Sequence, residues 1–249
     1  MHQARRPALL TLALVVLMVL LAGLTSTPSA AGSSGAPSAA SSARSSADQP
    51  HVLVLGDSIT SKSYYSRDVY GKGWWAHLVE DTDAYLIMSA ESGSGFVRQG
   101  LHCAGTTFGE RLAAMDLSRA DYVVVEGGVN DLFRCTGRDT MVWTKGRDLR
   151  SRIPAFMDQL AAAADQAGLP RDHLYVFTPW GTEWRPQRAR ITKVVRRQAQ
   201  RIGAEYVDVP AFPARLTRDG IHPTRKGSRF LYRKLVRGST LLDRITAAG

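Results

Sequence analysis

The sequence predicts a three-layer α/β domain in which helices cover both faces of a central parallel sheet. Short apolar runs, typical of buried strands, alternate along the chain with longer segments of helical periodicity. Most of the runs lead into Gly, Asn, Asp or Pro, the residues that end strands in tight turns. Strands separated by helices pair in parallel and need cover on both faces. Functional residues of such sheets lie just beyond the carboxyl ends of the strands.

Five apolar runs are the predicted strands of this sheet. Each contains β-branched or aromatic residues and is short enough to be a strand that is buried on both faces. The runs cover residues 52–55, 84–88, 122–125, 174–177 and 206–209.

The predicted helices lie between or after these runs, at residues 74–79, 108–115, 147–167, 186–202 and 226–235. The longest ends at Gly168, a common C-terminal stop, and Pro154 either kinks it or marks its true start. The segment 186–202 is strongly basic. Its apolar residues recur at helical spacing on one face, at Ile191, Val194, Val195 and Ile202.

The N-terminus has the pattern of a secretory signal over residues 1–31. Arg5 and Arg6 precede an apolar run at residues 8–24, and Ser29-Ala30-Ala31 offers a cleavage site. The sequence therefore predicts a secreted, extracellular protein. The alternative is an uncleaved membrane anchor with the domain outside, although the run is shorter than the roughly 20 residues that span a bilayer.

Residues 32–50 consist mainly of Ser, Ala, Gly and Pro and include no large apolar side chain. Such a segment cannot bury enough surface to offset its ordering entropy, so we expect a flexible tether. The remaining residues, 51–249, have the length of one domain with a sizeable core.

The predicted domain is basic. The chain has a net charge of +10, to which the signal contributes Arg5 and Arg6, while Arg44 and Asp48 of the tether cancel. The domain therefore keeps a charge of +8. This charge suits a nucleic acid, an anionic cell envelope or an acidic polysaccharide, or it merely aids solubility. Export argues against nucleic acid, and nothing in the sequence indicates an obligate protein partner.

The chain has two cysteines, Cys103 and Cys135. In an exported protein an isolated pair favours a disulfide, and two free thiols are the alternative. The six His residues are scattered, without zinc-ligand spacing, so no metal site is predicted.

Two short blocks follow the first and second predicted strands. Residues 56–60, Gly-Asp-Ser-Ile-Thr, place Ser58 in a tight turn that would present its hydroxyl at the edge of the sheet. Residues 92–95, Ser-Gly-Ser-Gly, allow a backbone N–H to approach a bound molecule closely. Either block alone is also an ordinary turn.

Two further blocks follow the third and fifth strands. Residues 128–131, Gly-Val-Asn-Asp, place the amide of Asn130 at a strand end, where it could donate to a developing oxyanion or simply cap a turn. Residues 219–223, Asp-Gly-Ile-His-Pro, allow Asp219 to hold the ring of His222 in one tautomer, although alone they also suit a surface turn.

In this order and after these strands, the four blocks resemble the SGNH/GDSL family of serine hydrolases, over nearly the whole domain. The resemblance implies a flavodoxin-like sandwich with Ser58 as nucleophile, His222 as base and Asp219 orienting the base. It assigns the oxyanion hole to the N–H groups of Ser58 and Gly93 and to the amide of Asn130. Gly93 is preferred to Gly95 because it follows the Ser92 position of the family's second block.

The resemblance further implies two-step acyl transfer on an ester, as in an esterase or lipase, without a metal or organic cofactor. The ester could belong to a small molecule, a lipid or a polysaccharide. We expect Asp219 to raise the pKa of His222 above its usual value of about 6.5, which would place maximal activity at neutral to alkaline pH. The absence of a Gly-x-Ser-x-Gly motif around Ser58 argues against the ordinary α/β-hydrolase plan.

The family's sheet order also places the cysteines. Its second and third strands flank the first, so Cys103 and Cys135 would lie on loops to either side of Ser58. The resemblance thus implies a disulfide at the mouth of the site, which closes a loop of roughly 30 residues and holds Gly93 and Asn130 in register.

Other functions stay open. An acyltransferase or deacetylase that acts on cell-envelope or plant polysaccharide would use the same residues. An inactive scaffold that binds an anionic polymer would suit the charge and the basic segment, but all four blocks are intact. Trp180 and Trp184 either line an acyl or sugar pocket or belong to the core or a loop.

Overall fold

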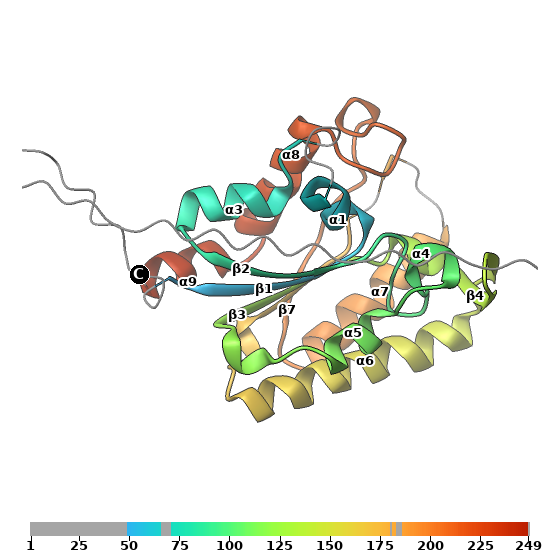
Figure 1. The fold of residues 1–249 in the computed structure, drawn as a ribbon, viewed down its shortest axis with the longest axis horizontal. Helices are drawn as coiled ribbons and strands as arrows, with labels where there is room; N and C mark the ends of the chain where they lie inside the picture. Colours follow the sequence, from blue (N-terminus) through green and yellow to red (C-terminus); the bar gives the residue numbers. More distant parts are fainter. Residues whose placement is uncertain (1–48, 66–70, 180, 183–185, 249) are drawn as a thin grey trace, which may run out of the picture. The chain divides into compact units, whose positions relative to one another are not determined.

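The described residues of the computed structural model form a sheet of five parallel strands (Figure 1). The structure describes residues 49–65, 71–179, 181–182 and 186–248. The strand order is β2-β1-β3-β6-β7, so the second and third strands flank the first, as expected. The strands are β1 His51–Gly56, β2 Tyr85–Ala90, β3 Tyr122–Glu126, β6 Leu174–Phe177 and β7 Glu205–Val207.

Helices cover both faces of the sheet, which confirms the predicted three-layer α/β class (Figure 1). One face carries α1 (Ser58–Tyr65), α3 (Trp74–Thr82), α8 (Arg225–Arg237) and α9 (Leu241–Ala248). The other carries α5 (Phe108–Ala113), α6 (Gly146–Ala167) and α7 (Pro186–Arg201). The remaining short elements are α4 (Gly100–Cys103) and the 3₁₀ turns η1 (Leu117–Arg119), η2 (Val129–Leu132), η3 (Arg171–His173) and η4 (Ala214–Leu216).

The core lies on both faces of the three inner strands, β1, β3 and β6. Residues 52–55 of β1 and 123–125 of β3 are fully buried, as expected for strands covered on both sides. On one face Trp74 packs edge-to-face on Phe177, with ring centroids 5.1 Å apart. Each large apolar side chain buried in this way stabilises the fold by about 1.5–3 kcal/mol, and together they fix where the strand ends lie.

Most predicted elements are confirmed, with three differences. The predicted strand 206–209 ends at Val207, so Val209 lies beyond β7. Pro154 lies inside α6, which begins at Gly146, while Gly168 ends that helix in the left-handed region at φ 69°. The sequence did not predict α9, nor the antiparallel hairpin of β4 (Phe133–Gly137) and β5 (Thr140–Trp143).

The hairpin carries one half of a disulfide. Cys135 on β4 is bonded to Cys103 at the end of α4, with a Cα–Cα distance of 5.6 Å, so the predicted pairing is confirmed. The predicted signal lies outside the described residues, as does nearly all of the tether, and both stay predictions. Within the described ranges, no helix has the length and apolar character needed to cross a membrane.

Candidate functional site

Ser58 is the first residue of α1, directly after the turn that leaves β1. It is only 6% exposed. The carboxylate of Asp57 accepts the N–H of Ile59 at 2.8 Å and so fixes the turn. Residue 56 must be glycine, because a Cβ there would lie 2.7 Å from the Cβ of Thr60. As the first N–H of a helix, that of Ser58 has no intrahelical partner and is available to a bound group.

The ring of His222 lies between Ser58 and Asp219. Its Nε2 is 3.0 Å from Ser58 Oγ, and its Nδ1 is 2.6 Å from Asp219 Oδ2. The other carboxylate oxygen of Asp219 accepts the N–H groups of Ile221 and His222. These contacts suit the tautomer in which Nδ1–H donates to Asp219 and Nε2 accepts the hydroxyl proton of Ser58. The structure thus brings together three of the residues that the sequence singled out.

The pKa of His222 lies below its ordinary value of 6.5, so the expectation of a raised pKa is wrong. Burial is the main cause, because it disfavours the charged ring. Asp219 opposes this effect, while Lys62 adds to it. Asp219 itself stays ionised: burial raises its pKa, but the hydrogen bonds from His222 and Ile221 outweigh burial and lower it to about 2.

Lys62 was missed by the sequence analysis. It lies one helical turn after Ser58 on α1, and its Nζ is 3.3 Å from His222 Nδ1. Two opposite charges, those of Asp219 and Lys62, therefore act on the same ring nitrogen. The only sequence signal was the four-residue spacing, which puts Lys62 and Ser58 on one side of a helix.

Asn130 lies in η2, at the turn that follows β3. Its Nδ2 donates to Asp57 Oδ2 at 3.1 Å and to the carbonyl of Ser94 at 3.0 Å. Its Oδ1 accepts from Arg98 at 3.5 Å. The amide therefore joins the second block to the turn that presents Ser58. Both of its hydrogens are engaged, so donation to a bound group requires it to release one of these partners.

The two candidate glycines of the second block differ in what their N–H groups do. The N–H of Gly95 donates to the carbonyl of Arg98 at 2.9 Å. By contrast, the N–H of Gly93 has no partner within the described part of the chain. Gly93 has a φ of 81°, which favours glycine. The carbonyl of Ser92, which shares a peptide group with the N–H of Gly93, accepts the N–H of Leu101 at 2.8 Å. These contacts favour Gly93 over Gly95 as a donor to a bound molecule.

Three fully buried carboxyl groups lie behind the Ser58 turn: Asp57, Glu126 and Asp131. Burial and then the neighbouring Glu126 raise the pKa of Asp57 well above its usual range. Burial raises the pKa of Glu126 to about 7, although Thr60 donates to its Oε2 at 2.7 Å. The sequence analysis missed Glu126, because it ends an apolar strand and carries no local signal.

Asp131 ties the second and third blocks together. Its carboxylate accepts the backbone N–H groups of Phe96, Val97 and Arg98 at 2.7–3.2 Å. Burial nevertheless raises its pKa to about 6. A side chain on Gly95 could not be accommodated, because its Cβ would lie 2.5 Å from an oxygen of Asp131. Asp131 therefore holds the backbone around Gly95 against the turn that carries Asn130.

Among the described residues, no group of His, Cys, Asp or Glu side chains could hold a metal ion. Trp180 and Trp184, which the sequence analysis left between a pocket and a packing role, lie outside the described residues.

Comparisons with known proteins concern the family of the sequence and its fold. Residues 54–230 match the model of the GDSL-like Lipase/Acylhydrolase family, and this range holds all four sequence blocks. No curated protein matches the sequence.

Solved esterases share the fold. The structure is similar to the aryl esterase of M. smegmatis, at a TM-score of 0.53 and 16% identity over 80% of this chain and 100% of that one. It is also similar to a variant of Axe2, an acetyl xylan esterase from Geobacillus stearothermophilus. The TM-score is 0.53 and the identity 19%, over 77% of this chain and 96% of that one. A third similar structure is the acetyl xylan esterase Est2A of Butyrivibrio proteoclasticus. The TM-score is 0.51 and the identity 13%, over 76% of this chain and 63% of that one.

Proposed function

Because this chain belongs to the GDSL-like lipase/acylhydrolase family and is a carboxylic ester hydrolase, we propose that it cleaves its ester through an acyl intermediate on Ser58. The observation that carries this proposal is the line of contacts from Ser58 Oγ through the ring of His222 to Asp219, at 3.0 and 2.6 Å. A nucleophile, a base and a group that orients the base, in hydrogen-bond reach of one another, are the parts that acyl transfer needs.

The reaction proceeds in two halves. In the first, Nε2 of His222 takes the hydroxyl proton while Ser58 Oγ attacks the ester carbonyl carbon. The bond to the alcohol oxygen then breaks, and that oxygen leaves with the proton from His222. In the second half, water gives a proton to His222 and attacks the acyl group. The bond to Ser58 Oγ then breaks, the acid leaves, and His222 returns the proton to Ser58 Oγ. Asp219 stabilises the imidazolium ion that forms in each half.

The negative charge on the carbonyl oxygen needs donors that are already in place. The N–H of Ser58 opens α1, and the N–H of Gly93 has no partner among the described residues, so both are available without reorganisation. The amide of Asn130 becomes the third donor when it releases one of its two partners, Asp57 Oδ2 or the carbonyl of Ser94.

For the substrate we propose an acyl ester outside the cell. Residues 1–31, with their basic start, apolar run and small-residue end, support export. Two of the similar structures are acetyl xylan esterases and one is an aryl esterase, which supports an acetyl ester or an aryl ester as the substrate.

A labelling experiment tests the nucleophile. A fluorophosphonate probe should label the wild-type protein at Ser58, and Ser58→Ala should lose both the label and nearly all esterase activity. Ser63→Ala is the matched control, because Ser63 is a buried serine on the same helix that donates to the carbonyl of Thr60. More than a tenth of wild-type activity in folded Ser58→Ala would refute the proposal, as would labelling at another serine.

A further inference from the structure

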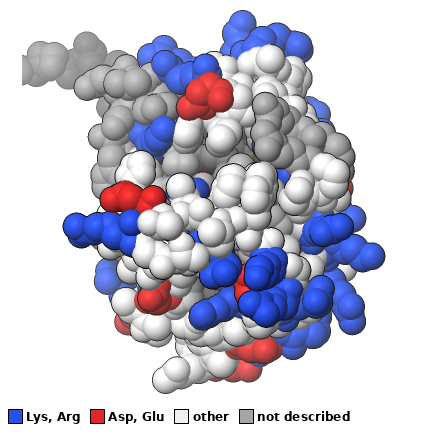
Figure 2. Space-filling model, turned by 90° about the vertical axis from the view of Figure 1, so that its right-hand side faces the viewer, with Lys and Arg blue, Asp and Glu red and all other residues white. Residues whose placement is uncertain are grey.

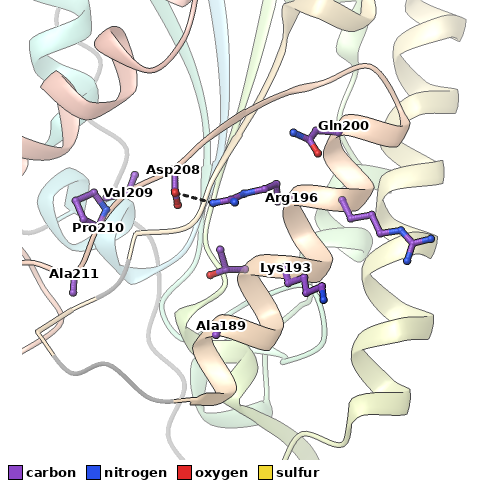
Figure 3. A pocket seen from close by; sticks show the side chains of 10 residues that line it. Ala189, Lys193, Arg196, Gln200, Asp208, Val209, Pro210 and Ala211 are labelled. Carbon is purple, nitrogen blue, oxygen red and sulfur yellow. Dashed lines mark ion pairs between the residues drawn. The ribbon is translucent and has the colours of Figure 1, made fainter.

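A groove of about 710 Å³ lies between α7 and the chain segment that follows β7. Figure 3 shows its two walls: Lys193, Arg196 and Gln200 project from α7, and residues 208–211 form the opposite side. Ala189, Pro210 and Ala211 leave apolar surface between the polar groups. An open groove with apolar walls and a few charged groups is suited to an extended ligand rather than to a small ion.

The charges in this groove are not balanced. Arg196 pairs with Asp208 at 2.7 Å, and its guanidinium lies 5.2 Å from the ring centroid of Tyr206. Asp208 is the acidic residue of the groove lining, so this pair neutralises it. Lys193 and Arg197 are exposed, and neither has an ion-pair partner among the residues that the structure describes. Their two positive charges lie one helical turn apart and remain available to a ligand.

The sequence of α7 maintains this excess of positive charge. The helix contains six Lys or Arg residues and neither Asp nor Glu. Cations at spacings of three and four repel one another, and each such pair destabilises a helix by about 0.2–0.5 kcal/mol. Lys and Arg side chains also crowd the lower right of the face shown in Figure 2. A solubilising surface would mix both signs, whereas an anionic ligand would offset this repulsion.

Each wall of the groove belongs to a segment that contacts or continues into a part of the site around Ser58. On α7, the side chain of Ile191 packs against Gly128: a Cβ built on Gly128 would lie 3.7 Å from it. Gly128 is the residue directly before η2, the turn that contains Asn130. On the other wall, the N–H of Phe212 donates to the carbonyl of Gly181 at 3.3 Å. The segment that begins at residue 208 then continues to Asp219 and His222.

We propose that this groove binds the anionic groups of a polysaccharide that carries the scissile ester. The inference rests on the proposed esterase function and names its substrate class as an acidic glycan. Side chains at spacing four on a helix are about 5–6 Å apart, a span comparable to one sugar residue. Lys193 and Arg197 would contact successive anionic groups, while the exposed wall at Pro210 and Ala211 would pack on the C–H face of the sugars.

Binding is measured in a Ser58→Ala background, so that it does not depend on turnover. The probes are polygalacturonate, whose sugars carry carboxylates, and dextran sulfate, whose sugars carry sulfates. Lys193→Gln/Arg197→Gln should weaken the binding of the anionic polymer about tenfold, as expected for the loss of two exposed contacts. The comparison of the two polymers identifies which anionic group is the better ligand.

A matched pair of substitutions on another helix distinguishes binding in the groove from general attraction to the positive charge of the protein. Arg233 and Arg237 on α8 are also exposed, have the same spacing of four, and lie on the opposite face of the sheet. Arg233→Gln/Arg237→Gln should change affinity by less than about twofold, since it leaves the groove intact. Ala211→Trp, which fills the groove without changing the charge, should weaken binding like the α7 pair. Equal losses from the α7 and α8 pairs, or no loss from either, would overturn the proposal.

Measurements of activity on two esters test the groove separately from the proposed esterase function. In the wild-type background, the α7 pair should lower kcat/KM on acetylated polygalacturonate about tenfold and leave hydrolysis of 4-nitrophenyl acetate unchanged. Loss on both esters, or on neither, would contradict the groove, whereas failed Ser58 labelling would contradict only the proposed function. Single-stranded DNA that binds more tightly than either glycan, with the same dependence on Lys193 and Arg197, would identify a nucleic-acid surface instead.

Discussion

The backbone N–H of Leu101 donates to the carbonyl of Ser92 at 2.8 Å, and that carbonyl belongs to the peptide group whose N–H is that of Gly93. Because a peptide group is planar, fixing its carbonyl also fixes the direction of its N–H. Leu101, His102 and Cys103 all have positive φ, at 45°, 57° and 66°, which costs energy for residues other than glycine. The disulfide from Cys103 to Cys135 holds this left-handed turn.

Removing the disulfide should therefore impair turnover before it unfolds the domain. In Cys103→Ala/Cys135→Ala the turn is free to relax, and the Gly93 N–H loses its fixed direction. We expect kcat to fall several-fold and the stability to fall by about 3–4 kcal/mol, the chain-entropy estimate for a loop of this size. Circular dichroism, thiol titration of the reduced wild type and kcat under mild reductant measure this. Unchanged kcat in reduced, folded protein would show that the disulfide has no role at the site.

Replacing Asn130 tests whether its amide stabilises the transition state. Asn130→Ala should lower kcat by about 100-fold or more, the scale expected for loss of one oxyanion donor. KM should change less, because the donor acts mainly on the charge that develops during attack. Steady-state kinetics on an aryl ester provide the measurement. A variant with normal kcat would reduce Asn130 to a link between Asp57 and Ser94.

The pH dependence should reflect the lowered pKa of His222. The base must be neutral, so kcat/KM should rise with pH through the pKa of His222 and reach its plateau at a lower pH than it would with a histidine of ordinary pKa. Lys62→Met removes a positive charge 3.3 Å from Nδ1, which raises the pKa and moves this limb to higher pH. Lys62→Arg keeps the charge and is the control. An acid limb that does not move in Lys62→Met would show that Lys62 does not contribute to the lowered pKa of His222.

Glu126 should make the fold less stable at alkaline pH. Burial raises the pKa of Glu126 to about 7 in the folded protein. At a pH below the pKa of the unfolded chain, Glu126 is neutral in both states and its ionisation costs no stability. As the pH rises through 7, the folded state must bury a charge, and stability is lost. Glu126→Gln removes this penalty while its amide oxygen still accepts from Thr60. Relative to wild type, the variant should gain about 1–3 kcal/mol between pH 5 and pH 8. Urea unfolding at both pH values checks this, and a constant difference would contradict it.

Local signals were sufficient for most of the fold. Apolar runs and helical periodicity located all five sheet strands and the helix that ends at Gly168, and each site block followed a predicted strand. The hairpin of β4 and β5 was missed because β4 carries no apolar run, and because the apolar run of β5, residues 141–143, is only three residues long and exposed. Val209 was wrongly placed in a strand because an alternating apolar pattern does not show where pairing stops.

The sequence alone determined which residue types follow the strands: a serine in a tight turn, glycines, an amide, and a carboxylate three residues before a histidine. The tertiary structure decided which of these meet, since Ser58 and His222 are 164 positions apart and only the packing of the sheet brings Oγ to 3.0 Å from Nε2. It also decided the direction of the His222 pKa shift. A pKa depends on burial and on charges from distant segments, which no local pattern records.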